Sequence, residues 1–165
     1  MRNKRITIRH RRRREGKTDY KARLKLLSSS LPRLIIRKSN KYIVAQLIES
    51  KEAQDYIICS VNSKELSKYG WNNSKKNVPA SYLTCFLLVK KCKGKVKKAI
   101  LDAGLYRSTT GSRIYACLKG AVDAGLQIPY SEEIIPKEER IKGMHINEKI
   151  VKDFEQVKQK ISEIK

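Results

Sequence analysis

The amino-acid sequence predicts an α/β fold with a mixed β-sheet, in which an antiparallel meander is followed by an α-β-α unit. Three strand-like runs lie close together between residues 34 and 61, and their short connections favour antiparallel neighbours. Two helical patterns separated by a further strand-like run follow, an order typical of helices packed on a sheet. Hydrophobic residues make up 40% of the chain, which is enough for one modest core.

The segment Met1–Arg14 carries eight Lys or Arg, one His and no acid, and it ends in the unbroken run Arg11–Arg14. Such a segment has too little apolar surface to order by burial, and its like charges repel until a polyanion lies between them. We therefore expect residues 1–16 to be a basic arm that is disordered alone and orders on nucleic acid. A localisation signal and a solubilising tail are the alternatives.

A short helix is expected over Asp19–Leu27, with Thr18 as its N-cap and Pro32 beyond its end. The strands are expected at Leu34–Arg37, Tyr42–Glu49 and Tyr56–Val61, which are rich in β-branched residues. Three apolar residues in succession from Leu34 predict that the first strand is covered on both faces.

The stretch Asn62–Asn77 is polar and predicts a loop that carries the sequence Tyr69-Gly70-Trp71. Aromatic side chains among basic and amide residues can stack on nucleobases. Trp71 could equally fill one edge of the core, and the sequence leaves both interpretations open.

Pro79 suits the first turn of a helix that we expect over Ala80–Lys91, and Lys95–Leu101 reads as the fourth strand. A second helix is expected over Gly111–Ala124. Beyond residue 130 we expect an extension, 131–165, that ends in a helix from Glu148 to about residue 164. The apolar stripe of this helix needs a partner surface, and packing on its own domain is slightly favoured over docking to another protein. The central domain is then 17–130.

The formal net charge of +22 points to a polyanionic partner. The whole excess lies in residues 1–131, because residues 132–165 carry equal numbers of acidic and basic side chains. No segment reads as a membrane span or as a secretory signal, so we expect no membrane partner.

The four cysteines are widely spaced in apolar runs, and neither His completes a ligand set. We expect reduced thiols of a cytosolic protein and no metal. Two-metal nucleases need several converging carboxylates, but the first strand has none and only Asp102 and Asp123 lie nearby. Asp102 is expected to pair with Arg107 or Arg113. The sequence therefore predicts no enzyme, no cofactor and no small-molecule substrate.

The second long helix begins in a segment suited to phosphate binding. Thr109, Thr110, Gly111 and Ser112 would offer hydroxyls and backbone donors at the helix start, flanked by Arg107 and Arg113. Helix capping explains the hydroxyls equally well, although it leaves the arginines unexplained.

Several segments together resemble one family, the 5S-rRNA-binding proteins called universal large-subunit protein eighteen, in their archaeal form. The matching segments are Arg11–Tyr20, Pro32–Leu34, Arg37–Lys41, Lys64–Leu66, Lys68–Trp71, Ala99–Asp102, Thr110–Arg113, Leu118–Leu126, Ile128–Pro129 and Glu138–Ile141. The resemblance implies a ribonuclease-H-like topology without its active site. It also implies a structural protein of the cytoplasmic ribosome that helps attach 5S rRNA to large-subunit rRNA in the central protuberance, beside a second 5S-binding protein.

The predicted RNA-binding surface has four parts. They are the basic arm of residues 1–16, a basic edge on the hairpin of the first two strands, the loop with Tyr69 and Trp71, and the start of the second long helix. A general nucleic-acid-compacting protein is the alternative function. The predicted RNA-binding residues are Arg5, Arg9, Arg11, Arg12, Arg13, Arg14, Lys17, Tyr20, Arg23, Arg33, Arg37, Lys38, Asn40, Lys41, Tyr69, Trp71, Arg107, Thr109, Thr110, Gly111, Ser112 and Arg113.

Overall fold

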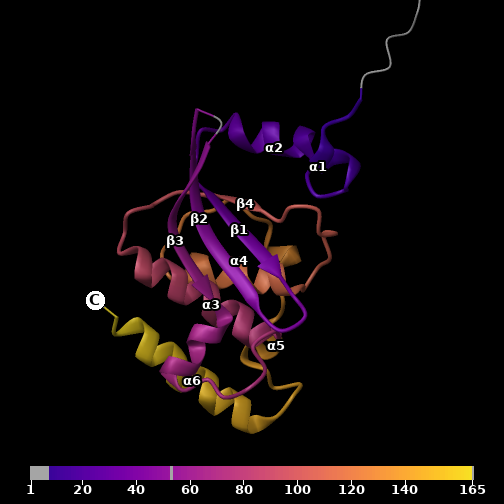
Figure 1. Cartoon of the computed structure of the whole chain (residues 1–165). Helices are drawn as coiled ribbons and strands as arrows, with labels where there is room; N and C mark the ends of the chain where they lie inside the picture. The colour runs from indigo at the N-terminus through magenta and orange to yellow at the C-terminus, as the bar shows by residue number, and fades with distance from the viewer. Residues whose placement is uncertain (1–7, 53, 165) are drawn as a thin grey trace, which may run out of the picture.

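A computed structural model describes residues 8–52 and 54–164. Strands β1 (Arg33–Lys38), β2 (Ile43–Lys51) and β3 (Gln54–Asn62) form an antiparallel meander. The short strand β4 (Ile100–Asp102) runs parallel to β1, so that the sheet order is β3-β2-β1-β4 (Figure 1). The predicted α/β fold with a mixed sheet is confirmed.

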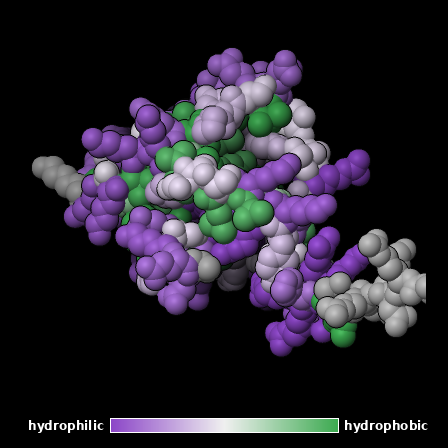
Figure 2. Space-filling model, turned by 90° about the horizontal axis from the view of Figure 1, so that it is seen from above, coloured by the Kyte–Doolittle hydropathy of each residue, from purple (hydrophilic) through white to green (hydrophobic). Residues whose placement is uncertain are grey.

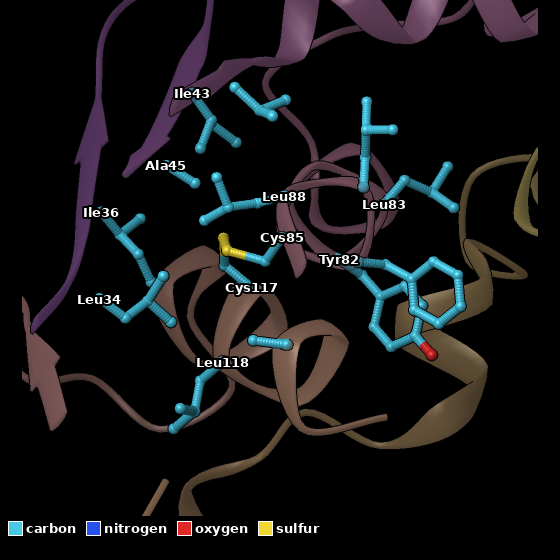
Figure 3. Close-up of a cluster of buried hydrophobic side chains, with 14 of the residues drawn as sticks. Leu34, Ile36, Ile43, Ala45, Tyr82, Leu83, Cys85, Leu88, Cys117 and Leu118 are labelled. Carbon is cyan, nitrogen blue, oxygen red and sulfur yellow. A yellow bond between two sulfur atoms is a disulfide. The ribbon is translucent and has the colours of Figure 1, made fainter. Parts of the chain in front are cut away.

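Helices α3 (Val78–Cys92) and α4 (Arg113–Asp123) pack against each other and cover one face of the sheet. The alternating residues Leu34 and Ile36 of β1 and Ala45 of β2 point toward these helices and are almost completely buried (Figure 3). Every second residue of these strands therefore faces the helices, and the helix faces that they contact are apolar. The core lies between the sheet and this helical layer.

Two of the four cysteines form a disulfide in this core, so the expectation of four reduced thiols is wrong. Cys85 of α3 and Cys117 of α4 are joined, with their Cα atoms 5.1 Å apart, whereas Cys59 and Cys92 are free (Figure 3). The pair is separated by 32 residues in the sequence. Only the packing of the two helices brings the sulfur atoms together, and spacing along the chain gives no sign of it.

The end of the basic arm is ordered, which corrects the expectation of disorder for those residues. Arg11–Arg14 form one helical turn, α1, and α2 follows at Tyr20–Leu27. Glu15 pairs with Arg11 at 3.3 Å and with Lys17 at 2.8 Å, which offsets part of the repulsion that favours disorder.

The cap of α2 also differs from the prediction. Asp19, not Thr18, is the N-cap residue, and its Oδ1 accepts hydrogen bonds from the amides of Lys21 and Ala22. Thr18 instead accepts a hydrogen bond from Nε of Arg12 at 2.9 Å. This bond ties α1 to the start of α2.

The polar stretch after β3 is not a simple loop, because Ser63–Tyr69 form the 3-10 helix η1. Asn62 caps it, and the Glu65 side chain accepts a hydrogen bond from the backbone amide of Asn62 at 3.0 Å. Gly70 ends η1 with a φ of 97°, a conformation that favours glycine.

The C-terminal part contains the 3-10 turn η2 (Glu132–Ile134) and helices α5 (Glu138–Lys142) and α6 (Glu148–Ser162). Helix α6 packs against α3 and η1 and buries Phe154, Val157 and Ile161. The apolar stripe therefore lies on the core of its own chain, as expected. Within the described residues, no helix has both the length and the apolarity needed to cross a bilayer.

Candidate nucleic-acid interface

The four arginines of α1 are exposed, and only Arg11 has an acidic partner among the described residues. Arg11 pairs with Glu15, and Arg12 donates to Thr18. Among the described residues, no carboxylate lies within ion-pair distance of Arg13 or Arg14. Seen from above, hydrophilic side chains gather around this N-terminal segment (Figure 2). The arrangement leaves guanidinium groups available for bidentate contacts with phosphates.

A hollow of about 220 Å³ lies where the α1–α2 segment meets the ends of β1 and β4, lined partly by Arg12, Lys17 and Arg37. Arg37 is anchored there, because its Nη1 donates to the carbonyl oxygens of Ile36 at 3.0 Å and Asp102 at 3.1 Å. Its side chain nevertheless remains 42% exposed. Arg37 therefore presents a positioned cation next to the basic α1–α2 segment.

Lys38 ends β1, and the turn to β2 carries Asn40 and Lys41, while Tyr106 fixes Lys38 in place. The Tyr106 hydroxyl donates to the Lys38 carbonyl at 2.8 Å and accepts from the Lys38 amide at 3.3 Å. The Lys38 ammonium lies 4.7 Å from the centre of the Tyr106 ring. Asn40, Lys41 and the neighbouring Arg107 are exposed. Sequence reasoning missed Tyr106, whose role depends on a contact 68 residues away along the chain.

Arg33 does not belong to this surface, which corrects the prediction that it contacts RNA. Its side chain is 1% exposed, and Nη1 lies 2.9 Å from Oδ2 of Asp102 while Nη2 lies 2.7 Å from Oδ1 of Asp55. Asp102 therefore pairs with Arg33 and Arg37, and not with Arg107 or Arg113 as expected. From the sequence alone, a basic residue at the start of a strand is expected to be exposed. Its carboxylate partners come from distant segments and become known only from the structure.

Arg23 is held by the same network, since its Nη2 lies 3.0 Å from both oxygens of Asp55. Burial opposes ionisation of Asp55, but hydrogen bonds from Ser50, Arg23 and Arg33 outweigh burial and hold the pKa of this carboxyl below its usual range. The network links α2 to β3 and β1. Arg23 thus has a structural role, and its predicted RNA contact stays a prediction.

Trp71 is completely buried, so the prediction that it stacks on RNA is wrong and the core interpretation is correct. Its Nε1 donates to the carbonyl oxygen of Ser74 at 3.1 Å, which satisfies the buried indole. The reversal at Gly70 turns the chain back toward the core at this point. Tyr69 is partly buried against the core, and its stacking on RNA stays a prediction.

Residues at the start of α4 contact other parts of the chain. The Gly111 amide donates to the carbonyl oxygen of Ile134 at 3.0 Å, and Arg113 Nη1 donates to that of Lys76 at 3.0 Å. Thr110 and Gly111 line a hollow with residues of α5. Ser112 is the N-cap residue but makes no capping hydrogen bond. Arg107, Thr109 and Thr110 remain exposed, whereas part of the predicted phosphate site is already engaged within the protein.

Arg5 falls outside the described residues, and Arg9 is exposed next to α1. Tyr20 at the start of α2 is 36% exposed, and its ring centre lies 5.3 Å from that of His10.

Among the described residues, no group of three or more potential metal ligands is found. The structure brings together Arg12 of α1, the start of α2, Arg37 and residues 103–105 around the hollow, and Tyr106 connects this region to Lys38 at the end of β1.

Comparison with known proteins identifies the family. A family model described as ribosomal large subunit proteins 60S L5 and 50S L18 matches residues 4–98 and 92–131. The large ribosomal subunit protein uL18 of Korarchaeum cryptofilum is 51% identical over 146 residues, covering 88% of this chain and 75% of that protein. The protein of the same name from Methanoregula boonei is 49% identical over 160 residues, covering 93% and 92%.

Both relatives are named as proteins of the large ribosomal subunit, which are structural components and not enzymes. All the segments that carry the resemblance lie within the matched range except Glu138–Ile141, which follows it. The chain belongs to the uL18 family and is a structural, non-enzymatic constituent of the large subunit of the cytoplasmic ribosome.

Proposed function

We propose that this chain binds 5S rRNA and helps attach it to large-subunit rRNA in the central protuberance, beside the second 5S-binding protein. The observation that carries the proposal is that Arg12 of α1, Lys17 of the α1–α2 segment and Arg37 of β1 line one hollow, with further exposed cations on α1 and at the β1–β2 turn. Membership of the uL18 family supports a ribosomal RNA as the polyanion.

The contacts are expected to differ along this surface. Arg13 and Arg14 lie on a single helical turn and can follow a phosphate backbone, so that they contribute mainly affinity. Arg37 and Lys38 are fixed by hydrogen bonds and ring contacts, so that they hold a defined geometry. Folded RNA is recognised largely through its shape and exposed bases, and fixed cations can discriminate between shapes.

The proposed interface keeps those predicted residues that are exposed or partly exposed at this hollow, on α1 and at the β1–β2 turn, and it leaves out Arg23, which lines the hollow but is held by Asp55. Arg5 stays in the proposal on its sequence alone, and Thr109 and Thr110 are peripheral to the hollow. The interface consists of Arg9, Arg11, Arg12, Arg13, Arg14, Lys17, Tyr20, Arg37, Lys38, Asn40, Lys41 and Arg107.

Deletion of residues 1–16 tests the proposal in a filter-binding titration with 5S rRNA at several salt concentrations. If about six phosphates are neutralised, the full chain should show a log–log salt slope of roughly −4 to −5. The deletion should lower affinity at moderate salt and make the slope shallower. Unchanged affinity and slope would remove the arm from the interface.

Competition separates specific binding from general compaction of nucleic acid. We expect 5S rRNA to displace bound 5S rRNA at moderate salt far better than duplex DNA of the same length. Equal competition by the two nucleic acids would favour the compaction function and contradict the proposal.

A further inference from the structure

A second basic surface lies on the segment that joins α3 to β4. Residues 90–98 contain six lysines and no acid. The sequence pattern predicts a strand from Lys95, but β4 begins only at Ile100, and the lysines precede it. In Figure 1 this segment runs along the left of the molecule, whereas α1 lies at the upper right.

The loop that presents these lysines is held in place. The chain reverses at Lys93 and Gly94, whose φ angles are 50° and 73°, and the Lys95 amide donates to the Cys92 carbonyl at 3.1 Å. Val96 is buried between the exposed Lys95 and Lys97, and Ala99 is buried directly after Lys98. The Gln127 amide donates to the Lys97 carbonyl at 3.0 Å, which fixes the loop to the segment after α4.

Four of the six ammonium groups have no structural partner in the part of the chain that is described. Lys91 pairs with Glu65, and Lys90 lies over the ring of Phe86 at 5.7 Å. Both also lie in the last turn of α3, where cations favour the helix dipole. Lys93, Lys95, Lys97 and Lys98 are exposed, and none forms an ion pair with a described residue.

The surface beside the loop is concave. A hollow of about 350 Å³ is lined by Lys90, Lys93 and Lys97 together with Gly125 and Ile164. Exposed, unpaired cations around a shallow hollow repel one another, and this cost is recovered when a chain of phosphates lies against them. An acidic protein surface would carry the same negative charge as the phosphates. The four lysines, however, recur at every one or two residues, and a phosphate backbone also repeats its charges along a chain, so it suits these lysines better.

We propose that Lys93, Lys95, Lys97 and Lys98 bind the phosphate backbone of a second RNA segment while the α1 side holds the first. The inference rests on the proposed function, because it assumes that the α1 side contacts RNA. It adds a separate binding surface, and the chain then clamps two RNA segments from two sides.

A matched pair of variants tests this surface. The loop variant carries Lys95→Gln, Lys97→Gln and Lys98→Gln, and the control carries Lys149→Gln, Lys152→Gln and Lys160→Gln. Both lose three positive charges from exposed positions, but the control lysines lie on α6, among acidic residues. Thermal unfolding should show that both variants remain folded.

Each protein is first bound to saturating 5S rRNA and is then titrated with a labelled 20-base-pair RNA duplex. We expect the loop variant to bind the duplex at least tenfold more weakly than the unaltered chain, with a log–log salt slope shallower by about 2. The control should stay within twofold. Equal capture of the duplex by the loop variant overturns the inference, whereas failure of the unaltered chain to bind 5S rRNA contradicts the proposed function.

Acylation of lysines in intact large subunits provides an independent measurement. Lys95, Lys97 and Lys98 should react at least tenfold more slowly in the subunit than in the free chain. If the three lysines react equally fast in the subunit and in the free chain, the inference is overturned. This result holds even if the unaltered chain does not bind 5S rRNA in the titration. Protection in the subunit combined with normal duplex capture by the loop variant would assign the surface to a protein partner and would also overturn it.

Discussion

Arg33 and Asp102 form a buried ion pair between the parallel strands β1 and β4, with Nη1 of the arginine 2.9 Å from Oδ2 of the aspartate. Each strand supplies one member, and the arginine also reaches Asp55 on β3. The pair therefore connects the short strand β4 electrostatically to the antiparallel part of the sheet. Removal of one partner would leave the other charged and buried, which costs more than the pair itself contributes.

We expect Asp102→Ala to lower the free energy of unfolding by about 3 kcal/mol, because Arg33 would lose a buried counter-ion. Urea unfolding followed by circular dichroism measures this change. Glu163→Ala, at an exposed position after α6, is the control and should change stability by less than about 0.5 kcal/mol. Equal effects of the two substitutions would show that the ion pair has no structural importance.

Asp55 should contribute to the loss of stability in acid. Its pKa in the folded protein lies below the ordinary value of 3.8, so its stabilising contribution is complete well above pH 3.8 and is lost as the pH falls through the folded pKa. Asp55→Asn should therefore be less stable than the unaltered chain at pH 7. The difference should shrink at pH 2, as measured by thermal midpoints at each pH. A difference that is constant with pH would contradict the assignment.

The disulfide predicts a definite thiol count. Denatured, unreduced protein should titrate two free thiols, from Cys59 and Cys92, and reduced protein should titrate four. Replacement of both Cys85 and Cys117 by alanine should lower stability by roughly 3 kcal/mol, since a loop of this length is then open in the unfolded chain. Four reactive thiols before reduction would contradict the bridge.

Trp71 should matter for stability and not for RNA binding. Trp71→Ala should cost about 3–5 kcal/mol because it empties a fully buried site. Trp71→Phe keeps most of the apolar volume and serves as a folded variant for binding. Its affinity for 5S rRNA should equal that of the unaltered chain, and a large loss of affinity would revive the stacking interpretation.

The hydroxyl of Tyr106 should support RNA affinity indirectly. Tyr106→Phe removes both hydrogen bonds to the Lys38 backbone but keeps the ring beneath the ammonium group. We expect 5S rRNA affinity to fall a few-fold through a looser β1–β2 turn. Tyr130→Phe is the matched control, because the structure records no hydrogen bond of its hydroxyl among the described residues, and its affinity should be unchanged.

The order of strands and helices could be predicted from the sequence because hydrophobic periodicity reflects the faces that are buried. The strand of Leu34–Ile36 and the apolar stripe of α6 are examples. The fates of Arg33, Trp71 and Cys85 could not be predicted in this way. The environment of each residue depends on a partner from a distant segment of the chain. A single sequence gives the residue types but does not show which distant residues come into contact. The lysines at 93–98 were visible in the sequence, but the alternation around Val96 resembled a strand.

Gly120 sits against the backbone of Tyr82, so close that a methyl group at this position would meet the Tyr82 carbonyl oxygen far inside van der Waals contact. The disulfide joins residues 85 and 117, which lie three positions further along α3 and three positions back along α4. The two contacts show that the helices run in opposite directions here, and they set the interhelical separation at neighbouring points. A larger residue at 120 would pull on the sulfur bridge as well as on the backbone, so tolerance of that residue depends on whether the thiols are oxidised.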